Sequence, residues 1–419
     1  MSVPKRLDVY KGADLVGFLY NDHPIRFVYD ETWRTQHTES VSPHIDISHP
    51  EHSGQKVEAY FENLLPEAGI RDLLKMKHQV TTTFGLLGAI GGDTASDLTI
   101  LPEGAQPEPA EYKLITWQDV ADEFQQQQGV IQTAHAKDGM RISLAGAQRK
   151  LSICIDLYGN PTLPLGHSPS TYIVKPDIKG LEGVWASAIN ETFVMVLGSK
   201  LGMGVAEAFY QPIAKACVIK RYDRVLDKSG QITRLHQLDV CQIDGKASTI
   251  KYEADGGPTL LRCKEILNEM GVVAADKKRF IQWIFFNLFV GNNDSHAKNL
   301  SIYFPPKQGV KLTPFYDLLS TSLYPGLSRK FALTIGEESI ASKITKIEIV
   351  NMSEMLGFKP KYVLKVAEKV ANDLLFMIDD VANEINQVAA VGTEKTMVER
   401  LHQHISSQTK SFQKHLFVD

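Results

Sequence analysis

The sequence predicts an α+β fold of two lobes, with a β-rich N-terminal subdomain and a mostly helical C-terminal lobe. Three observations predict it. Short strand-like apolar stretches dominate residues 1–48. Strand and helix patterns mix between residues 112 and about 225, and helical periodicity prevails from about residue 258 onward. The 419 residues suffice for two or three domains, which we expect at 1–108, 109–257 and 258–419.

The first part is predicted to hold short strands and two helices, followed by a linker. The expected strands are residues 7–10, 15–20, 25–29 and 98–101, and the expected helices are residues 57–65 and 68–76. Segment 102–111, PEGAQPEPAE, is rich in Pro, Gly and Glu and is therefore the predicted linker.

The remaining elements follow from the same periodicities. Strands are expected at 153–157, 172–175, 216–220 and 301–304, an amphipathic helix at 185–201, and further helices at 362–388 and 396–406. Residues 280–290 are too apolar on every side for a surface helix, so we expect a buried helix that ends at Gly291. Pro305, Pro306 and Gly309 predict a hairpin loop.

Composition excludes several classes of protein. The net charge of −4 gives no global argument for nucleic-acid binding. Four widely spaced Cys predict neither a zinc site nor a disulfide framework. The N-terminus has no apolar leader segment, and no apolar run approaches membrane-spanning length. We therefore expect a soluble, cytosolic protein that does not enter the membrane.

Three polar residues after the buried helix point to chemistry. Asn299 follows Asp294 by five residues, and Asp317 ends the segment Thr-Pro-Phe-Tyr-Asp. Phosphoryl transfer needs one carboxylate to orient a hydroxyl and accept its proton, and an Asn with a second carboxylate to hold Mg²⁺. Protein kinases have this order and nearly this spacing. A turn-forming loop is the alternative for any one residue, but the three together favour a kinase-like, two-lobed fold.

Other residues fit the ATP side of such a site. In segment 141–150 the small residues Ala145, Gly146 and Ala147 would let backbone N–H groups approach phosphates, although the Walker A pattern is missing. Lys175 ends an apolar strand, as the phosphate-binding lysine of kinases does. The alternative is an edge-strand lysine that favours solubility.

At two positions the sequence does not decide between a role in ATP binding and an ordinary solvated side chain. Glu191 is placed in sequence to pair with Lys175, but an exposed helix glutamate is the more common case. The strand that ends at Lys220 either reads an adenine edge through its backbone or is simply solvated, and spacing alone favours solvation.

Together these motifs resemble the HipA toxin kinases of bacterial type II toxin–antitoxin systems, over nearly the whole chain. The similar segments are FENLLPE (61–67) and 84–93 in the N-terminal HipA domain, 141–150 in the phosphate loop, 251–258 with Lys-Tyr-Glu and Asp-Gly-Gly-Pro, and 291–301 with 312–317 in the catalytic and metal segments.

The resemblance implies an ATP- and Mg²⁺-dependent serine/threonine kinase with Asp294 as catalytic base. It implies Asn299 and Asp317 as Mg²⁺ ligands, and Ser143 as an autophosphorylation site that switches the enzyme off. The residues implied at the nucleotide are Ala145, Gly146, Ala147, Gln148, Arg149, Lys150, Lys175, Lys220, Arg221, Tyr222, His296, Ala297, Lys298, Asn299 and Tyr316.

The resemblance also implies partners. These are a HipB-like helix-turn-helix antitoxin, operator DNA bound through the toxin–antitoxin complex, and a protein substrate such as an aminoacyl-tRNA synthetase in the bacterial cytoplasm. Two alternatives remain: a DNA-bound co-repressor that uses the kinase fold as a scaffold, and a small-molecule or lipid kinase. The four polar residues Lys175, Asp294, Asn299 and Asp317 argue against a pure scaffold, and the N-terminal match argues against a lipid kinase.

The sequence departs from the family pattern at three places. Ser295 stands where Gly is common, and Lys220 where an acidic residue can occur; we expect both to be tolerated. Ser96-Asp97 replaces a frequent Gly-Ala, and we expect altered antitoxin or substrate contacts there.

Overall fold

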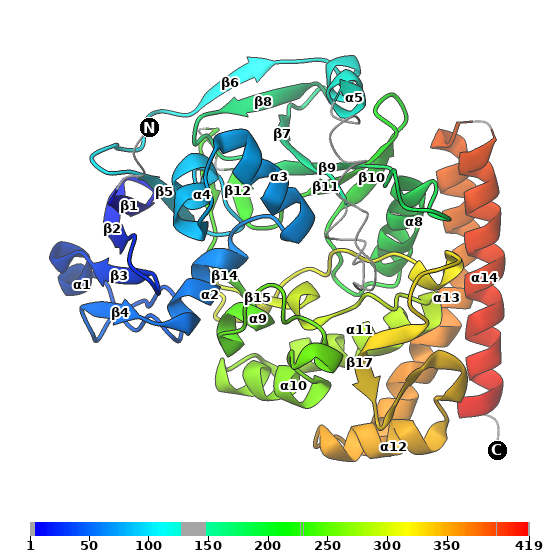
Figure 1. Ribbon diagram of the computed structural model, residues 1–419. Helices are drawn as coiled ribbons and strands as arrows, with labels where there is room; N and C mark the ends of the chain where they lie inside the picture. Colours follow the sequence, from blue (N-terminus) through cyan, green and yellow to red (C-terminus); the bar gives the residue numbers. More distant parts are fainter. Residues whose placement is uncertain (1–4, 127–147, 227, 229, 391, 418–419) are drawn as a thin grey trace.

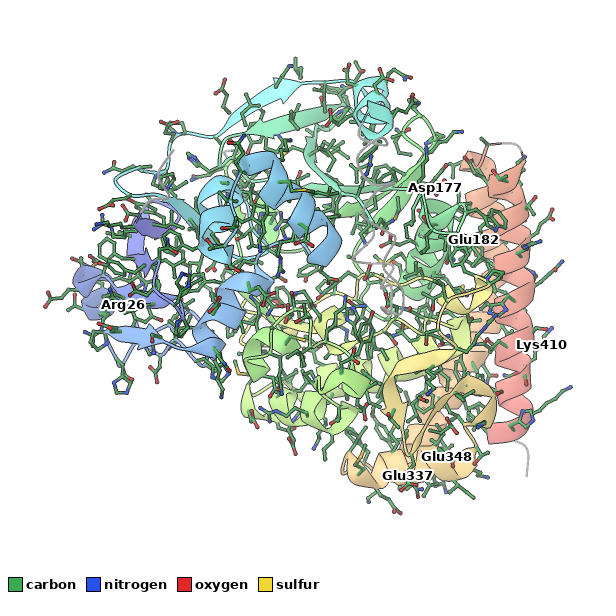
Figure 2. All side chains as sticks on the ribbon, viewed as in Figure 1. Arg26, Asp177, Glu182, Glu337, Glu348 and Lys410 are labelled. Carbon is green, nitrogen blue, oxygen red and sulfur yellow. The ribbon has the colours of Figure 1, made fainter. Side chains whose placement is uncertain are left out.

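The computed structural model describes residues 5–126, 148–226, 228, 230–390 and 392–417. The N-terminal sheet lies at one side of the molecule and the two C-terminal helices at the other (Figure 1). Arg26 and Lys410 mark these opposite ends (Figure 2). The β-rich N-terminal part and the mostly helical C-terminal lobe agree with the predicted α+β fold.

The N-terminal part is a five-stranded antiparallel sheet in the order β4-β3-β2-β1-β5. Its elements are β1 (Arg6–Lys11), β2 (Asp14–Tyr20), β3 (Arg26–Tyr29), α1 (Glu31–Gln36), β4 (Glu51–Ser53), α2 (Gln55–Asn63), α3 (Ala68–His78), α4 (Thr83–Ile90) and β5 (Leu98–Pro102). The predicted strands and helices of this part are confirmed.

A six-stranded antiparallel sheet follows, in the order β10-β11-β9-β7-β8-β6. Its elements are β6 (Glu111–Leu114), α5 (Trp117–Gln126), β7 (Leu151–Ile155), β8 (Pro161–Leu165), β9 (Tyr172–Pro176), α8 (Ser187–Lys200), β10 (Ala208–Gln211) and β11 (Ala216–Lys220). Alternate side chains of β11 point to opposite faces. Ala216 and Val218 join a small core with α5, whereas Cys217 and Ile219 belong to the main core on the α8 side.

Helix α8 is not the amphipathic helix that the sequence predicts. It is buried on nearly every side, because it lies between the six-stranded sheet and the two long C-terminal helices. A helix covered on both sides has no solvent-facing stripe that needs polar residues.

The C-terminal lobe holds six helices among the described residues. They are α9 (Val240–Asp244), α10 (Leu260–Glu269), α11 (Ala274–Val290), α12 (Lys346–Met355), α13 (Pro360–Val388) and α14 (Thr393–Leu416). The predicted buried helix is confirmed as the second half of α11. Helix α14 extends beyond the predicted residues 396–406 at both ends.

Short strands and 3₁₀ turns connect these helices. They are β12 (Arg224–Leu226), β13 (Ile232–Arg234), β14 (Gln237–Asp239), η1 (Glu253–Asp255), η2 (Ala297–Asn299), β15 (Ser301–Tyr303), β16 (Lys311–Leu312), η3 (Thr321–Leu323), β17 (Lys330–Ile335), β18 (Glu338–Ile340) and η4 (Ala341–Lys343). The β15–β16 hairpin is as predicted, whereas the β17–β18 hairpin is not.

One apolar core runs from the N-terminal sheet to the C-terminal helices, and α2 packs on α9 of the C-terminal lobe. The N-terminal part is therefore anchored on the helical lobe. In the part of the chain that the structure describes, no helix combines the length and apolar character needed to cross a membrane.

Candidate active site

The loop after α11 holds Asp294. Helix α11 ends at Gly291, which has a φ of 72°, and a β-carbon there would lie 1.9 Å from Oγ of Ser322. This position therefore requires glycine, as predicted. The Asp294 carbonyl accepts hydrogen bonds from the N–H of His296 (2.9 Å) and from Nδ2 of Asn299 (3.2 Å). The structure thus brings Asp294 and Asn299 together on one short loop.

Asp317 approaches this loop from another segment. Phe315, two residues earlier, donates its N–H to the Gly204 carbonyl (2.9 Å) and accepts from the N–H of Ala206 (2.8 Å). Nδ2 of Asn292 donates to the Asp317 carbonyl at 3.4 Å. Asp317 has a φ of 58°, a left-handed conformation that costs a residue with a β-carbon about 1 kcal/mol. Such strained residues cluster at functional sites.

A buried lysine connects the sheet to this segment. Lys175 on β9 lies opposite Cys217 on β11, and cross-strand neighbours share one face of a sheet, so Lys175 faces α8. Its Nζ lies 2.6 Å from Oε1 of Glu191 on α8 and 2.8 Å from Oδ1 of Asp317. Glu191 has no exposed surface. The more common case of an exposed glutamate is therefore wrong here.

One ammonium faces two carboxylates in this triad. Burial opposes the charge of Asp317, but the charge and hydrogen bond of Lys175 prevail and lower the pKa of Asp317. Burial raises the pKa of Glu191. Oε2 of Glu191 has no hydrogen-bond partner among the described residues. The triad thus sets two acidic side chains against one ammonium.

Part of the predicted phosphate loop, Ser143, Ala145, Gly146 and Ala147, lies outside the described residues. Gln148 is buried and donates to the carbonyl of the last residue of β9 (3.3 Å), and Arg149 donates to a carbonyl of α5 (3.2 Å). Solvent reaches the Lys150 side chain, yet the surrounding protein and the charge of Lys175 lower the pKa of Lys150. Lys150 therefore lies near the triad.

Residues 220–222 lie at the end of β11. Lys220 is exposed, and its ammonium pairs with Glu207 at 3.1 Å. The backbone N–H groups of Lys220 and Arg221 each donate to a neighbouring segment at 2.8 Å. The Tyr222 ring stacks on Tyr316, with 6.0 Å between the centroids. The Lys220 side chain is thus solvated, whereas the adenine-binding role of this backbone stays a prediction.

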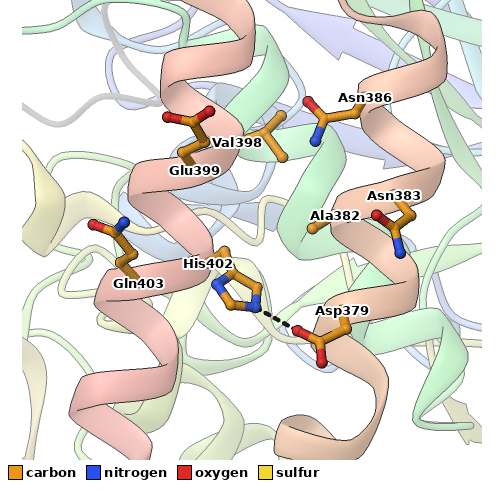
Figure 3. A pocket seen from close by; sticks show the side chains of 8 residues that line it. All are labelled: Asp379, Ala382, Asn383, Asn386, Val398, Glu399, His402 and Gln403. Carbon is orange, nitrogen blue, oxygen red and sulfur yellow. Dashed lines mark hydrogen bonds and ion pairs between the residues drawn. The ribbon is translucent and has the colours of Figure 1, made fainter.

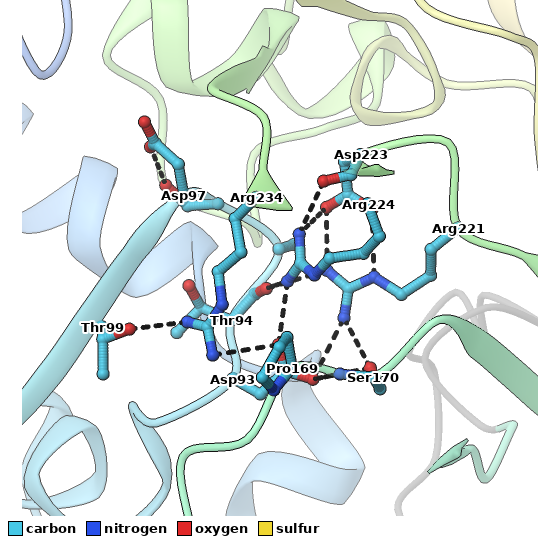
Figure 4. A network of polar contacts seen from close by, with 12 residues as sticks. Asp93, Thr94, Asp97, Thr99, Pro169, Ser170, Arg221, Asp223, Arg224 and Arg234 are labelled. Atoms are coloured by element: carbon cyan, nitrogen blue, oxygen red, sulfur yellow. Dashed lines mark hydrogen bonds and ion pairs between the residues drawn. The ribbon is translucent and has the colours of Figure 1, made fainter. Parts of the chain in front are cut away.

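Arg221 is buried in a charged network with the N-terminal part (Figure 4). It pairs with Asp223 (2.8 Å) and with Asp93 after α4 (3.3 Å), and Arg224 pairs with the same carboxylates at 2.7 and 2.8 Å. Burial opposes the charge of Asp93, yet Arg221, Arg224 and Arg234 lower its pKa to about 2. The Arg221 guanidinium is thus occupied by these carboxylates, so the predicted contact with a nucleotide is left to the Arg221 backbone.

Most of the loop of residues 291–300, which holds Asp294 and Asn299, is buried. His296 and Ala297 have no exposed surface, and neither ring nitrogen of His296 has a hydrogen-bond partner among the residues that the structure describes. Burial and a nearby lysine charge lower the pKa of His296 to about 3, so the ring is neutral near pH 7. Nζ of Lys298 donates to Oδ1 of Asn63 (2.8 Å), and the Tyr316 hydroxyl donates to the Lys298 carbonyl (2.9 Å).

This geometry agrees with the comparisons with known proteins. Residues 142–378 match the model of the HipA-like C-terminal domain, and residues 7–101 match that of the HipA N-terminal domain. The chain belongs to the HipA family. It is 30% identical over 363 residues to the serine/threonine-protein kinase toxin HipA of Shewanella oneidensis, covering 82% of this chain and 81% of the relative.

Two further comparisons agree. The chain is 34% identical over 351 residues to the putative kinase Y4mE of Sinorhizobium fredii, covering 79% of this chain and 81% of that one. A structure of HipA from Shewanella oneidensis MR-1, solved with HipB and its operator DNA, matches with a TM-score of 0.85 and 25% identity over 98% of each chain. The protein is a HipA-family serine/threonine kinase toxin with the predicted kinase-like fold, and kinase membership implies the use of ATP.

Any effect of Ser96-Asp97 on antitoxin or substrate contacts in this HipA-family kinase would have to be indirect, and it stays a prediction. Ser96 and Asp97 have exposed fractions of 0% and 2%, so neither side chain presents itself to a partner. Asp97 instead pairs with Lys11 (3.1 Å) and with Nδ1 of His236 (2.9 Å). It connects β1 to the segment before β14.

Sequence reasoning missed four residues that surround the site: Glu67, Asp93, Lys251 and Tyr252. All lie in blocks that carry the resemblance to the HipA family, which was the available signal. Their partners are distant in the chain, and a single sequence does not show such pairs.

A separate polar groove of about 380 Å³ lies between α13 and α14 (Figure 3). His402 and Asp379 pair across it at 2.6 Å. None of its lining residues belongs to the predicted nucleotide site.

Proposed function

We propose that this HipA-family kinase transfers the γ-phosphoryl group of ATP to a protein hydroxyl, with Asp294 as base and with Asn299 and Asp317 as Mg²⁺ ligands. The contact of Lys175 with both Glu191 and Asp317 carries this proposal. In protein kinases a strand lysine pairs with a helix glutamate, and both the pair and the metal-binding aspartate must be in place for activity.

The donor set at Asn299 and Asp317 fits Mg²⁺. This ion prefers oxygen ligands and takes few from protein, with the rest from phosphates and water. Nδ2 of Asn299 donates to the Asp294 carbonyl, which leaves Oδ1 for a cation. Among the described residues, no group of three or more His, Cys, Asp or Glu is placed to hold a metal. Bound Mg²⁺ would neutralise charge on the transferring group.

The residues of the chain supply the remaining steps. Lys175, held by Glu191, binds the α- and β-phosphates, and the backbone of 145–150 surrounds the phosphate chain. Asp294 accepts the proton of the acceptor hydroxyl as that oxygen bonds to the γ-phosphorus. The bond from this phosphorus to the bridging oxygen of ADP breaks. The backbone of 220–222, His296 and Tyr316 line the nucleoside.

The partners belong to the same proposal. The Shewanella HipA structure contains HipB and operator DNA, which supports a HipB-like antitoxin and operator binding through the complex for this chain. An aminoacyl-tRNA synthetase is the proposed target, on the basis of the resemblance to the family. Incubation of the full chain with labelled ATP and the host's translation machinery tests this target, because a labelled synthetase band is expected.

Expression without an antitoxin is expected to arrest growth through the kinase site. Asp317→Ala should grow normally, because loss of a metal ligand weakens Mg-ATP binding as well as turnover. Growth curves of cells that express equal amounts of each protein measure this. Equal arrest by wild type and Asp317→Ala would instead indicate a scaffold that acts by sequestering DNA or a partner.

Phosphorylation of Ser143 is expected to switch the kinase off. A phosphate adds a charge of about −1.5 to −2 close in sequence to Ala145-Gly146-Ala147. It either repels the ATP phosphates or is held outside by nearby arginines, which moves the loop. Mass spectrometry after incubation with Mg-ATP should find phosphate on Ser143 in wild type and none in Asp294→Ala. A Ser143→Asp variant with normal ATP binding and turnover would argue against a charge-driven switch.

A further inference from the structure

Two sequence blocks that have no role in this mechanism meet at the loop of residues 291–300, which we call the catalytic loop. They are residues 61–67 and 251–258. We infer that Glu67, Lys251 and Tyr252 are positioning residues for phosphoryl transfer, through which the N-terminal part holds Asp294 in its working orientation. This inference rests on the proposed role of Asp294 as base.

Tyr252 contacts the base directly. Its hydroxyl donates to Oδ1 of Asp294 at 2.6 Å, and its ring packs edge-on against His296 with 5.2 Å between the centroids. A carboxylate otherwise rotates over a broad range about its terminal torsion. A general base must stay within hydrogen-bond reach of the proton that it accepts. The Tyr252 bond therefore favours one orientation of the Asp294 carboxylate.

Lys251 ties Tyr252 to the N-terminal part. Its ammonium forms an ion pair with the carboxylate of Glu67, the residue immediately before α3, and the two side chains are only 6% and 16% exposed. Burial opposes the charge of Glu67, but Lys251 prevails and the pKa of Glu67 falls to about 2. Separating the pair would leave an uncompensated charge in the interior. The contact therefore resists opening.

The backbone around Tyr252 is also held in place. Tyr252 is extended (φ −90°, ψ 138°) directly before η1, and Nζ of Lys251 lies over its ring, 5.5 Å from the centroid. Oε2 of Glu253 accepts from the N–H of Thr334 on β17 at 2.7 Å. Gly257 donates its N–H to the Tyr252 carbonyl at 2.9 Å, and a β-carbon there would lie 2.7 Å from the same oxygen. The segment has little room to withdraw from Asp294.

A second contact supports the same role for the N-terminal part. Asn63 at the end of α2 accepts from Nζ of Lys298 (2.8 Å) and donates to the Lys246 carbonyl (2.9 Å). Lys298 directly precedes the proposed metal ligand Asn299. The N-terminal part therefore contacts the loop directly at Lys298, and through the Glu67–Lys251 pair it supports Tyr252, the partner of Asp294.

The same junction offers a matched control. Glu62 pairs with Arg71 and accepts from Oγ of Ser248 at 2.9 Å. These partners lie outside the catalytic loop. Glu62→Gln therefore breaks a similarly buried ion pair at this junction without touching the base.

The test compares Glu67→Gln, Lys251→Met, Lys251→Arg and Tyr252→Phe in the full chain. Transfer from Mg-[γ-³²P]ATP to proteins of a host extract gives the rate, and titration with Mg-AMPPNP gives nucleotide affinity. Glu67→Gln, Lys251→Met and Tyr252→Phe should each lower the rate about 10- to 100-fold, since small displacements of a reacting group have effects of that size. Nucleotide affinity should not change, and Lys251→Arg should restore the rate.

Four outcomes separate the possibilities. If Tyr252 acts through the base, Tyr252→Phe should have no further effect in an Asp294→Ala background. This inference alone would be overturned if Glu67→Gln and Tyr252→Phe transferred phosphate at the wild-type rate while Asp294→Ala was inactive. An equal loss of rate in Glu62→Gln would also overturn it. A wild-type rate in Asp294→Ala would overturn the proposed function and this inference with it.

Discussion

Asp294→Ala is expected to lower the rate of phosphoryl transfer by about 10²–10⁴-fold, the usual cost of removing a general base. Mg-ATP should still bind, because Asn299, Asp317 and Lys175 remain. The physical reason is the proposed division of roles: Asp294 would face the acceptor hydroxyl, whereas Asp317, which contacts Lys175 at 2.8 Å, would hold the metal. Transfer of labelled phosphate and nucleotide titration measure the two effects separately.

Asp380→Ala is the control for loss of a carboxylate, because Asp380 is exposed on α13. It should match wild type in both measurements. Near-normal turnover in Asp294→Ala would show that another group accepts the proton.

Lys175→Met is expected to destabilise the fold as well as abolish ATP binding. It leaves Glu191 and Asp317 buried without the cation that lies 2.6 and 2.8 Å from them. Breaking a buried ion pair by removal of one partner costs about 3–5 kcal/mol. Urea denaturation should show this loss in the free energy of unfolding, with an unchanged dependence on urea.

Lys369→Met provides the matched comparison. Lys369 pairs with Asp373 on α13 at 2.7 Å, but its side chain is 64% exposed, and such pairs contribute about 0.5 kcal/mol or less. An equal loss of unfolding free energy in Lys175→Met and Lys369→Met would contradict a buried triad at Lys175.

The sequence predicted those parts of the fold that have a local pattern. The apolar run Phe280–Val290 and Gly291 define α11 and its end, and both follow from side chains adjacent in the chain. Helix α8 was misjudged because its burial comes from α13 and α14, which lie far along the chain. The β17–β18 hairpin was missed because its short strands lie within a region of helical periodicity.

The predicted site residues also divide into those with a local sequence pattern and those without one. Asp294, Asn299 and Asp317 were predicted because their order and spacing carry the signal, and the structure brings them into one region. The Lys175–Glu191 pair remained open because a glutamate on a helix is usually exposed. Glu67 and Lys251 were not assigned because their contact spans 184 positions of the chain. The side chains of 127–147 lie outside what the structure describes, so the roles of Ser143 and Ala145–Ala147 stay predictions.

The most direct measurement of the central claim compares Asp294→Ala and Asp317→Ala side by side for Mg-ATP affinity and for transfer of the γ-phosphate. The proposed site predicts that Asp294→Ala binds Mg-ATP as wild type does but hardly transfers phosphate, whereas Asp317→Ala is impaired in both. Wild-type transfer in both variants, or the same loss of affinity in both, would contradict it.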